Sequence, residues 1–185
     1  GEITLKHCRD LIGEGLRRLL ELGLETTGGP IDEKVLDRLV ASSLDYYANH
    51  LTDNSKVYDG VIQILESLAS SNVPMAVCSN KPISLARRLL SDLRLSRYFH
   101  VITGGDSFAV RKPDAGHLLC TLEPMGVAAQ NAIMVGDSET DVAAARNAGM
   151  KVIAVSYGYT RISADQLGAD FVVNNFLELP RAFTM

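Results

Sequence analysis

The chain has few cysteines, and they are scattered. Cys8, Cys78 and Cys120 lie far apart, and no two of them form a Cys-x-x-Cys pair. The sequence therefore indicates neither a zinc site nor a disulfide framework. Isolated thiols of this kind are typical of a reducing compartment, so we expect a cytoplasmic protein.

The sequence also lacks long apolar runs and an excess of basic residues. Its longest apolar runs are the length of a strand, far short of the roughly 20 residues that span a bilayer. The segment from Gly1 to Asp10 is polar and mixed, unlike a signal peptide. The net charge is −4, and no basic stripe of the kind that binds nucleic acid is present. We therefore expect neither a membrane nor a nucleic acid as a partner.

Before about residue 73 the chain has helical patterns and no strand candidate. A helix capped by Thr4 is expected to break at residues 13–15. A second apolar stripe starts at Leu16 and is expected to end at Gly23, ahead of a loop over residues 26–30. A further amphipathic helix is predicted over residues 31–47.

The remainder alternates short apolar runs with helical patterns. The predicted strands are Pro74–Cys78, His100–Thr103, Ala132–Val135, Val152–Ser156 and Phe171–Val173. The predicted helices between them are Ile83–Leu93, Ala115–Met125 and Glu139–Ala148. Continuously apolar strands imply burial on both faces, and their alternation with helices implies a parallel sheet. The sequence thus predicts an α/β fold, with a helical unit at residues 1–57 and a doubly wound, Rossmann-like unit at residues 58–185.

Polar residues and glycines follow three successive strands of this predicted sheet. They are Ser79-Asn80-Lys81, Gly104-Gly105-Asp106 with Lys112 shortly afterwards, and Gly136-Asp137-Ser138-Glu139-Thr140-Asp141. In an open α/β sheet, ligands bind beyond the carboxyl ends of the strands. We therefore expect a hydroxyl, a lysine and a carboxylate pair at one edge, beside glycines that expose backbone N–H groups.

This set of groups suits phosphoryl transfer, in which catalysis consists mostly of positioning and charge neutralisation. Ser79 can donate a hydrogen bond to a phosphoryl oxygen, and Lys112 supplies a compact positive charge. Asp137 and Asp141 are oxygen ligands of the kind that Mg²⁺ takes, together with water and substrate oxygens.

Each of these residues also has a simpler interpretation when taken alone. Ser79 could cap the helix that begins near Ile83, and Lys112 could be a solvated loop lysine. Asp137 and Asp141 could be a helix cap and a first-turn acid, and Asp106 could be a turn residue. His117 is expected on a helix surface. The ordered placement after three strands favours the shared site over coincident caps.

Three segments resemble motifs of the haloacid dehalogenase superfamily. They are MAVCSNKP at residues 75–82, RKPD at 111–114 and VGDSETD at 135–141, which resemble its second, third and fourth motifs. In this form they are most similar to the phosphoglycolate phosphatases of the superfamily. TLKHCRDLIGEGL at residues 4–16 resembles the start of the helical cap domain of those enzymes, including its substrate-contacting loop.

The first motif of the superfamily, Asp-x-Asp-Gly-Thr, has no counterpart here, because no two aspartates lie two residues apart. In the family that motif ends the first, central strand and carries the nucleophile and the acid/base. The resemblance implies that this strand lies upstream of Gly1, unless another strand or a partner chain replaces it. We expect no phosphatase turnover from residues 1–185 alone.

For the complete protein, the resemblance implies Mg²⁺-dependent hydrolysis of a small phosphate monoester, with 2-phosphoglycolate favoured, through an aspartyl-phosphate. Ser79 and the Asn80 N–H would hold phosphoryl oxygens, and Lys112 would neutralise them. Asp137 would ligate Mg²⁺, with Asp141 supporting it directly or through water. The substrate's other end would meet the cap loop, Gly13-Glu14-Gly15.

Other functions remain open from the sequence. The chain could belong to another phosphatase of the superfamily or to a β-phosphoglucomutase-like phosphotransferase, and the cap loop would decide between these. A different class of function would be a non-catalytic phosphate-binding or scaffold protein, or a subunit of a split enzyme. The expected partner is a small phosphorylated metabolite, and the expected state is a monomer or homodimer.

Overall fold

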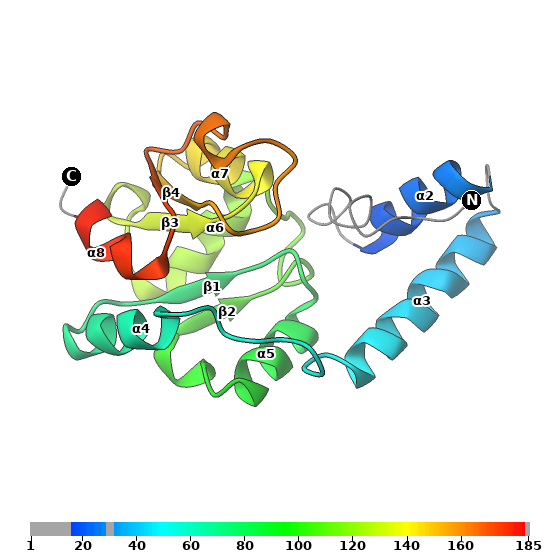
Figure 1. Ribbon diagram of the computed structural model, residues 1–185, viewed down its shortest axis with the longest axis horizontal. Helices are drawn as coiled ribbons and strands as arrows, with labels where there is room; N and C mark the ends of the chain where they lie inside the picture. The colour runs from blue at the N-terminus through cyan, green and yellow to red at the C-terminus, as the bar shows by residue number, and fades with distance from the viewer. Residues whose placement is uncertain (1–15, 29–31, 184–185) are drawn as a thin grey trace.

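The computed structural model describes residues 16–28 and 32–183 (Figure 1). Two helices, α2 (Leu16–Thr27) and α3 (Glu33–Asn49), form a helical unit beside the rest of the chain. The expected end of α2 at Gly23 is wrong, because the helix continues through this buried glycine. A residue without a side chain can be accommodated in a helix where a neighbouring element packs closely against it.

The start of α3 follows from its capping residue. The side chain of Asp32 accepts a hydrogen bond from the Lys34 N–H at 2.8 Å, which satisfies one of the free donors of the first turn. The helix that was predicted over residues 31–47 therefore exists, displaced by two residues. Leu36 is its buried residue, and several other apolar side chains of α3 are only half-buried.

All five predicted strands are present, with bounds shifted by no more than two residues. They are β1 (Ala76–Cys78), β2 (Val101–Thr103), β3 (Ile133–Gly136), β4 (Lys151–Val155) and β5 (Phe171–Val173). The helices of this part are α4 (Val61–Ser70), α5 (Ile83–Asp92), α6 (Ala115–Leu122), α7 (Glu139–Asn147) and α8 (Leu179–Ala182). The helix α4 was not predicted from the sequence. The predicted end of α6 at Met125 is too late, because a 3₁₀ turn containing Pro124 follows Leu122.

The strands form two separate parallel pieces. One piece pairs β1 with β2, and Val77 lies opposite Ile102. The other has the order β3-β4-β5, and Met134 lies opposite Val152. Within the described part of the chain, β1 and β3 are therefore each paired on one side only. Their residues are half-buried, whereas β4 is buried from its second residue onward.

Strand β4 is covered on both faces, as a doubly wound sheet requires. Val152 packs in a cluster with α6 and α7, which includes Leu118 and Val142. Ile153 and Val155 point to the other side, into a cluster with α4 and α8 that includes Leu179. The predicted α/β class with a parallel sheet is confirmed.

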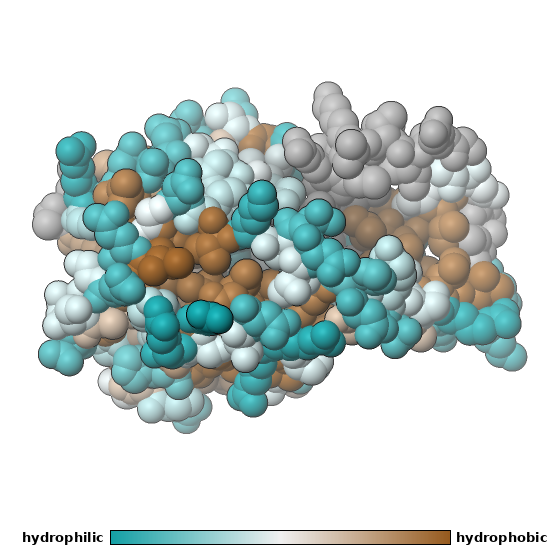
Figure 2. All heavy atoms as spheres, turned by 60° about the horizontal axis from the view of Figure 1, so that its bottom comes forward, coloured by the Kyte–Doolittle hydropathy of each residue, from teal (hydrophilic) through white to brown (hydrophobic). Residues whose placement is uncertain are grey.

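No helix of the described residues is long and apolar enough to cross a membrane. The surface is mixed, and one view shows apolar side chains gathered over the α/β part with hydrophilic side chains around them (Figure 2). Exposed large apolar residues of the α/β part and its linker include Tyr58, Ile62 and Leu177. These side chains are exposed and belong to none of the three hydrophobic clusters inside the α/β part.

Candidate active site

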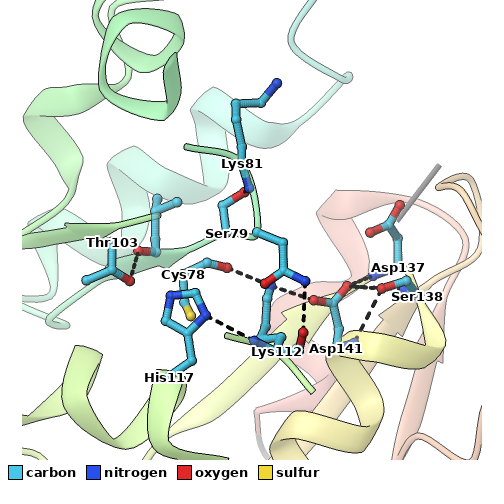
Figure 3. A network of polar contacts seen from close by, with 11 residues as sticks. Cys78, Ser79, Lys81, Thr103, Lys112, His117, Asp137, Ser138 and Asp141 are labelled. Carbon is cyan, nitrogen blue, oxygen red and sulfur yellow. Dashed lines mark hydrogen bonds and ion pairs between the residues drawn. The ribbon is translucent and has the colours of Figure 1, made fainter. Parts of the chain in front are cut away.

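The loop after β1 presents Ser79 at the carboxyl end of the strand (Figure 3), and Asn80 is the next residue of that loop. The Ser79 hydroxyl accepts a hydrogen bond from the Lys81 N–H at 3.1 Å, and Pro82, not Ser79, precedes α5 as its capping residue. The helix-cap interpretation of Ser79 is therefore wrong. The Asn80 amide donates to the Lys112 carbonyl at 2.9 Å, and its buried Oδ1 has no hydrogen-bond partner among the described residues.

Lys112 is buried, with 7% of its surface exposed, so it is not a solvated loop lysine. Its Nζ lies 2.7 Å from the Cys78 carbonyl oxygen and 2.7 Å from Asp141 Oδ1. The first contact is at the end of β1 and the second is in the first turn of α7. One ammonium group therefore connects the carboxyl ends of the two pieces of sheet (Figure 3).

His117 is fully buried, so its expected place on a helix surface is wrong. It lies in α6 on the same side as Leu118, Thr121 and Leu122, which are also buried. Its Nδ1 accepts the Lys112 backbone N–H at 3.1 Å. Burial lowers the pKa of His117, and the nearby Lys112 charge lowers it further. A neutral imidazole thus fixes the backbone of Lys112, and the spacing of these four buried residues along the helix was the signal that could have identified it.

Asp141 is buried and surrounded by donors. Its Oδ2 accepts hydrogen bonds from the Asp137 N–H at 3.1 Å, from the Ser138 N–H at 3.2 Å and from the Ser138 hydroxyl at 2.8 Å. Burial alone would raise the pKa of Asp141, but the Lys112 charge and these bonds outweigh it, so the pKa lies below the usual range. Both oxygens are occupied within the protein. The structure therefore favours a supporting role for Asp141 over direct coordination of a metal.

Asp141 also completes a capping box with Ser138, the capping residue of α7. Asp141 is thus an acid in the first turn of α7, as the simpler interpretation held. It also forms the ion pair with Lys112, which that interpretation did not include. The interpretation of Asp137 as the helix cap is wrong, because Ser138 occupies that position.

Asp137 presents a carboxylate of a different character. Its Oδ2 accepts the Tyr159 N–H at 2.7 Å, which leaves Oδ1 available. Burial raises the pKa of Asp137, and the charge of Asp141 raises it further. Because Lys112 is paired with Asp141, little positive charge remains to compensate the negative charge of Asp137. A divalent cation next to Asp137 would supply that charge and favour the ionised carboxylate.

The donor set fits Mg²⁺, which usually takes one or two carboxylates and completes its shell with water and substrate oxygens. Residues 16–28 and 32–183 contain no cluster of three or more histidine, cysteine or acidic side chains that could form a closed metal cage. Asp137 is the described residue that could ligate the ion, and the remaining ligands would come from elsewhere.

The glycines after β2 do not present free N–H groups, contrary to expectation. The Gly105 N–H donates to the Lys81 carbonyl at 2.9 Å, and the Gly104 N–H donates to the Ser107 hydroxyl at 2.8 Å. A Cβ atom at Gly105 would lie 2.4 Å from the Asn80 carbonyl oxygen, so a glycine is needed where these two loops meet. Asp106 accepts the Ile83 N–H at 2.7 Å and supports the start of α5.

The predicted cap loop, Gly13-Glu14-Gly15, lies outside the described residues. The helical unit does contact the site region elsewhere. Lys81 Nζ lies 4.3 Å from the centre of the Tyr47 ring on α3 and forms a hydrogen bond with the Tyr47 hydroxyl. This contact was not predicted from the sequence.

Comparison with known proteins gives a consistent result. Residues 1–155 match the model of the haloacid dehalogenase-like hydrolase family. The phosphoglycolate phosphatase of Caulobacter vibrioides is 36% identical over 97% of this chain and 76% of its own length. The phosphoglycolate phosphatase of Agrobacterium fabrum is 38% identical over 97% and 77%.

A crystal structure from Haemophilus somnus, described as a predicted phosphoglycolate phosphatase, has the same fold. The TM-score is 0.90 at 24% identity, over 97% of this chain and 83% of the other. Together with the ordered motifs around Ser79, Lys112 and Asp137, these matches show that the chain belongs to the haloacid dehalogenase-like hydrolases.

Proposed function

We propose that the complete protein is a Mg²⁺-dependent phosphatase of small phosphate monoesters, and that 2-phosphoglycolate is its preferred substrate. The observation that carries this proposal is the position of the buried Lys112 ammonium, which is held by Cys78 and Asp141 between the loops that bear Ser79 and Asp137. The choice of substrate is supported by the two phosphoglycolate phosphatases that are 36% and 38% identical.

Each side chain has a defined part in this proposal. An ammonium group has three N–H donors, and Lys112 uses two of them within the protein, so one can face a phosphoryl oxygen. The Ser79 hydroxyl accepts from Lys81 and can donate its own proton to a second oxygen. The Asn80 N–H is the proposed third donor. These groups would hold the phosphoryl group and offset its charge.

Asp137 would be the protein ligand of Mg²⁺, through its available Oδ1. When bound, the ion would reduce the repulsion between an attacking carboxylate and the phosphate dianion. Asp141 would keep Lys112 and residues 137–138 in place, because it contacts all of them.

We further propose that the nucleophile is an aspartate on a strand that lies upstream of Gly1. The one-sided pairing of β1 and β3 supports this, since a strand between them would complete the sheet. A carboxylate at its carboxyl end would lie near Lys112. That carboxylate would attack phosphorus and form an aspartyl-phosphate, while a second aspartate protonated the leaving alkoxide and then activated water.

A substrate panel tests the function against its alternatives. The full-length protein with Mg²⁺ should release phosphate from 2-phosphoglycolate with a kcat/KM about tenfold or more above that for β-glucose 1-phosphate or pyrophosphate. Interconversion of glucose phosphates would indicate the phosphotransferase instead. Binding of phosphate without turnover of any ester would indicate a non-catalytic protein.

A further inference from the structure

We propose that the loop after β4, residues 156–161, positions the Asp137 carboxylate for a divalent cation, through the bare backbone of Gly158 and the N–H of Tyr159. The inference rests on the proposed function of Asp137 as a metal ligand. The loop lies about 20 residues further along the chain than Asp137, and its sequence contains none of the predicted site residues.

The first observation is the absence of space at Gly158. A Cβ atom there would lie 2.1 Å from Asp137 Cβ and 2.3 Å from Asp137 Oδ2. Real side chains do not approach each other this closely, so the loop backbone lies directly against the Asp137 carboxylate. The close approach, rather than a backbone conformation reserved for glycine, is what requires glycine at this position.

The second observation is the hydrogen bond from the next residue. The Tyr159 N–H donates to Asp137 Oδ2 at 2.7 Å, while the Tyr159 side chain is exposed. A carboxylate with one oxygen held by a backbone donor cannot rotate freely, and its other oxygen is presented in a fixed direction. Groups that orient a metal ligand in this way strengthen metal binding.

The loop itself is anchored at both ends. Tyr157 packs against the cluster that contains Val155 and Val173, and its ring centre lies 4.8 Å from that of Tyr58. At the other end, the Arg161 N–H donates to Glu139 Oε1 in the first turn of α7 at 3.3 Å. The backbone that contacts Asp137 is therefore anchored at one end by packing beside β4 and at the other by a hydrogen bond to α7.

The substitution Gly158→Ala tests the proposal in the full-length protein. Its Cβ atom must displace the Asp137 carboxylate or the loop, so Mn²⁺, used as a probe for Mg²⁺, should bind about tenfold or more weakly. Binding is measured from the electron paramagnetic resonance signal of free Mn²⁺. Gly28→Ala is the matched control, because the nearest atom of the described residues to its added Cβ lies 4.0 Å away, and it should bind Mn²⁺ as the wild type does.

A double-mutant cycle separates the local contact from a general loss of folding. Gly158→Ala should lower the Tm of the wild type, but it should lower it much less in an Asp137→Gly background, where the side chain that it meets is gone. An equal loss in both backgrounds would overturn the proposal. So would wild-type Mn²⁺ affinity in the Gly158→Ala variant, or a wild-type protein that does not bind Mn²⁺. Because these measurements do not depend on turnover, failure of the proposed phosphatase activity would be seen separately.

Discussion

Lys112 supplies the positive charge that compensates the buried carboxylate of Asp141. It is buried together with Asp141, at a distance of 2.7 Å, and no other cation contacts that carboxylate among the described residues. Removal of one partner of such a pair leaves a buried charge without compensation, which costs far more than the pair contributes relative to apolar residues.

The variant Lys112→Met should therefore lose phosphatase activity and about 3 kcal/mol or more of unfolding free energy, measured by urea denaturation. The double variant Lys112→Met/Asp141→Asn should recover part of that stability, because the remaining charge is removed, while it stays inactive. Lys34→Met on the exposed side of α3 is the control and should change stability by less than about 0.5 kcal/mol. A loss below about 1 kcal/mol in the single variant would contradict the account of this pair.

His117 gives the protein a specific dependence on pH. Its pKa is lowered by burial and by Lys112, so the unfolded chain takes up a proton at a higher pH than the folded one. Stability from this group is then complete above the unfolded-state pKa, near 6.5, and falls as pH drops below it, by at most about 1.4 kcal/mol per pH unit. The pKa of Asp141 is lowered in the folded protein, so the stability that its ionised carboxylate contributes is lost only at lower pH, as that carboxylate is protonated.

The variant His117→Asn keeps an acceptor for the Lys112 N–H and removes the titration. The difference in unfolding free energy between pH 7.5 and pH 5.5 should be smaller in this variant than in the wild type. The same pH difference in His117→Asn and wild type would show that His117 is not the group responsible.

The sequence could predict that Ser79, Lys112 and Asp137 come together, because each follows a strand in a parallel sheet and such strands end at one edge. It could not show how their neighbours hold them. His117 and Gly158 act through burial and backbone contact across the fold, and neither leaves a local pattern of polar residues. The fit of Asp141 to a first-turn acid likewise concealed its pairing with Lys112.

At the scale of elements, α7 connects helix capping to the site. Its capping residue, Ser138, donates to the same Asp141 oxygen that the Asp137 N–H contacts, so the cap also orients the carboxylate that holds Lys112. By contrast, among the described residues the Asp32 side chain that caps α3 has a hydrogen bond only to the first turn of its own helix.

This difference predicts unequal effects of two similar substitutions. Ser138→Ala and Asp32→Ala should each cost about 1 kcal/mol of stability, the usual value for an N-cap. Only Ser138→Ala should also lower kcat for phosphate release, since only that cap bonds to Asp141. Thermal unfolding and steady-state rates on the two variants check this. If both variants lowered kcat by the same factor, the Ser138 cap would have no specific effect on the site.

The boundaries of the elements show where sequence patterns are weak. All five strands were predicted because continuous apolar runs are distinctive, and Phe171–Val173 was predicted to the residue. The end of α2 was not, because glycine is a common stop signal and only packing shows that Gly23 lies within the helix. The helix α4 (Val61–Ser70) begins just after the predicted boundary between residues 57 and 58, in a stretch for which the sequence predicted no element.

At the scale of the whole molecule, the main feature is that the sheet consists of two separate pieces, which no strand of the described residues joins. The order of the three motifs along the chain was enough to predict the family, which the match over residues 1–155 confirms. In the proposed function, the substrate and the nucleophile depend on parts of the molecule outside the described residues, so neither could be derived from the contacts of Ser79, Lys112 and Asp137.

The rate of phosphate release from 2-phosphoglycolate as a function of Mg²⁺ concentration tests the central claim most directly. The full-length protein should show a rate that rises to saturation with Mg²⁺ and is abolished by a chelator. The Asp137→Asn variant should be slower by about 100-fold or more, since loss of a supporting group alone costs 10- to 100-fold in affinity or activity. Turnover that is independent of the metal, or an Asp137→Asn variant with the wild-type rate, would contradict the account.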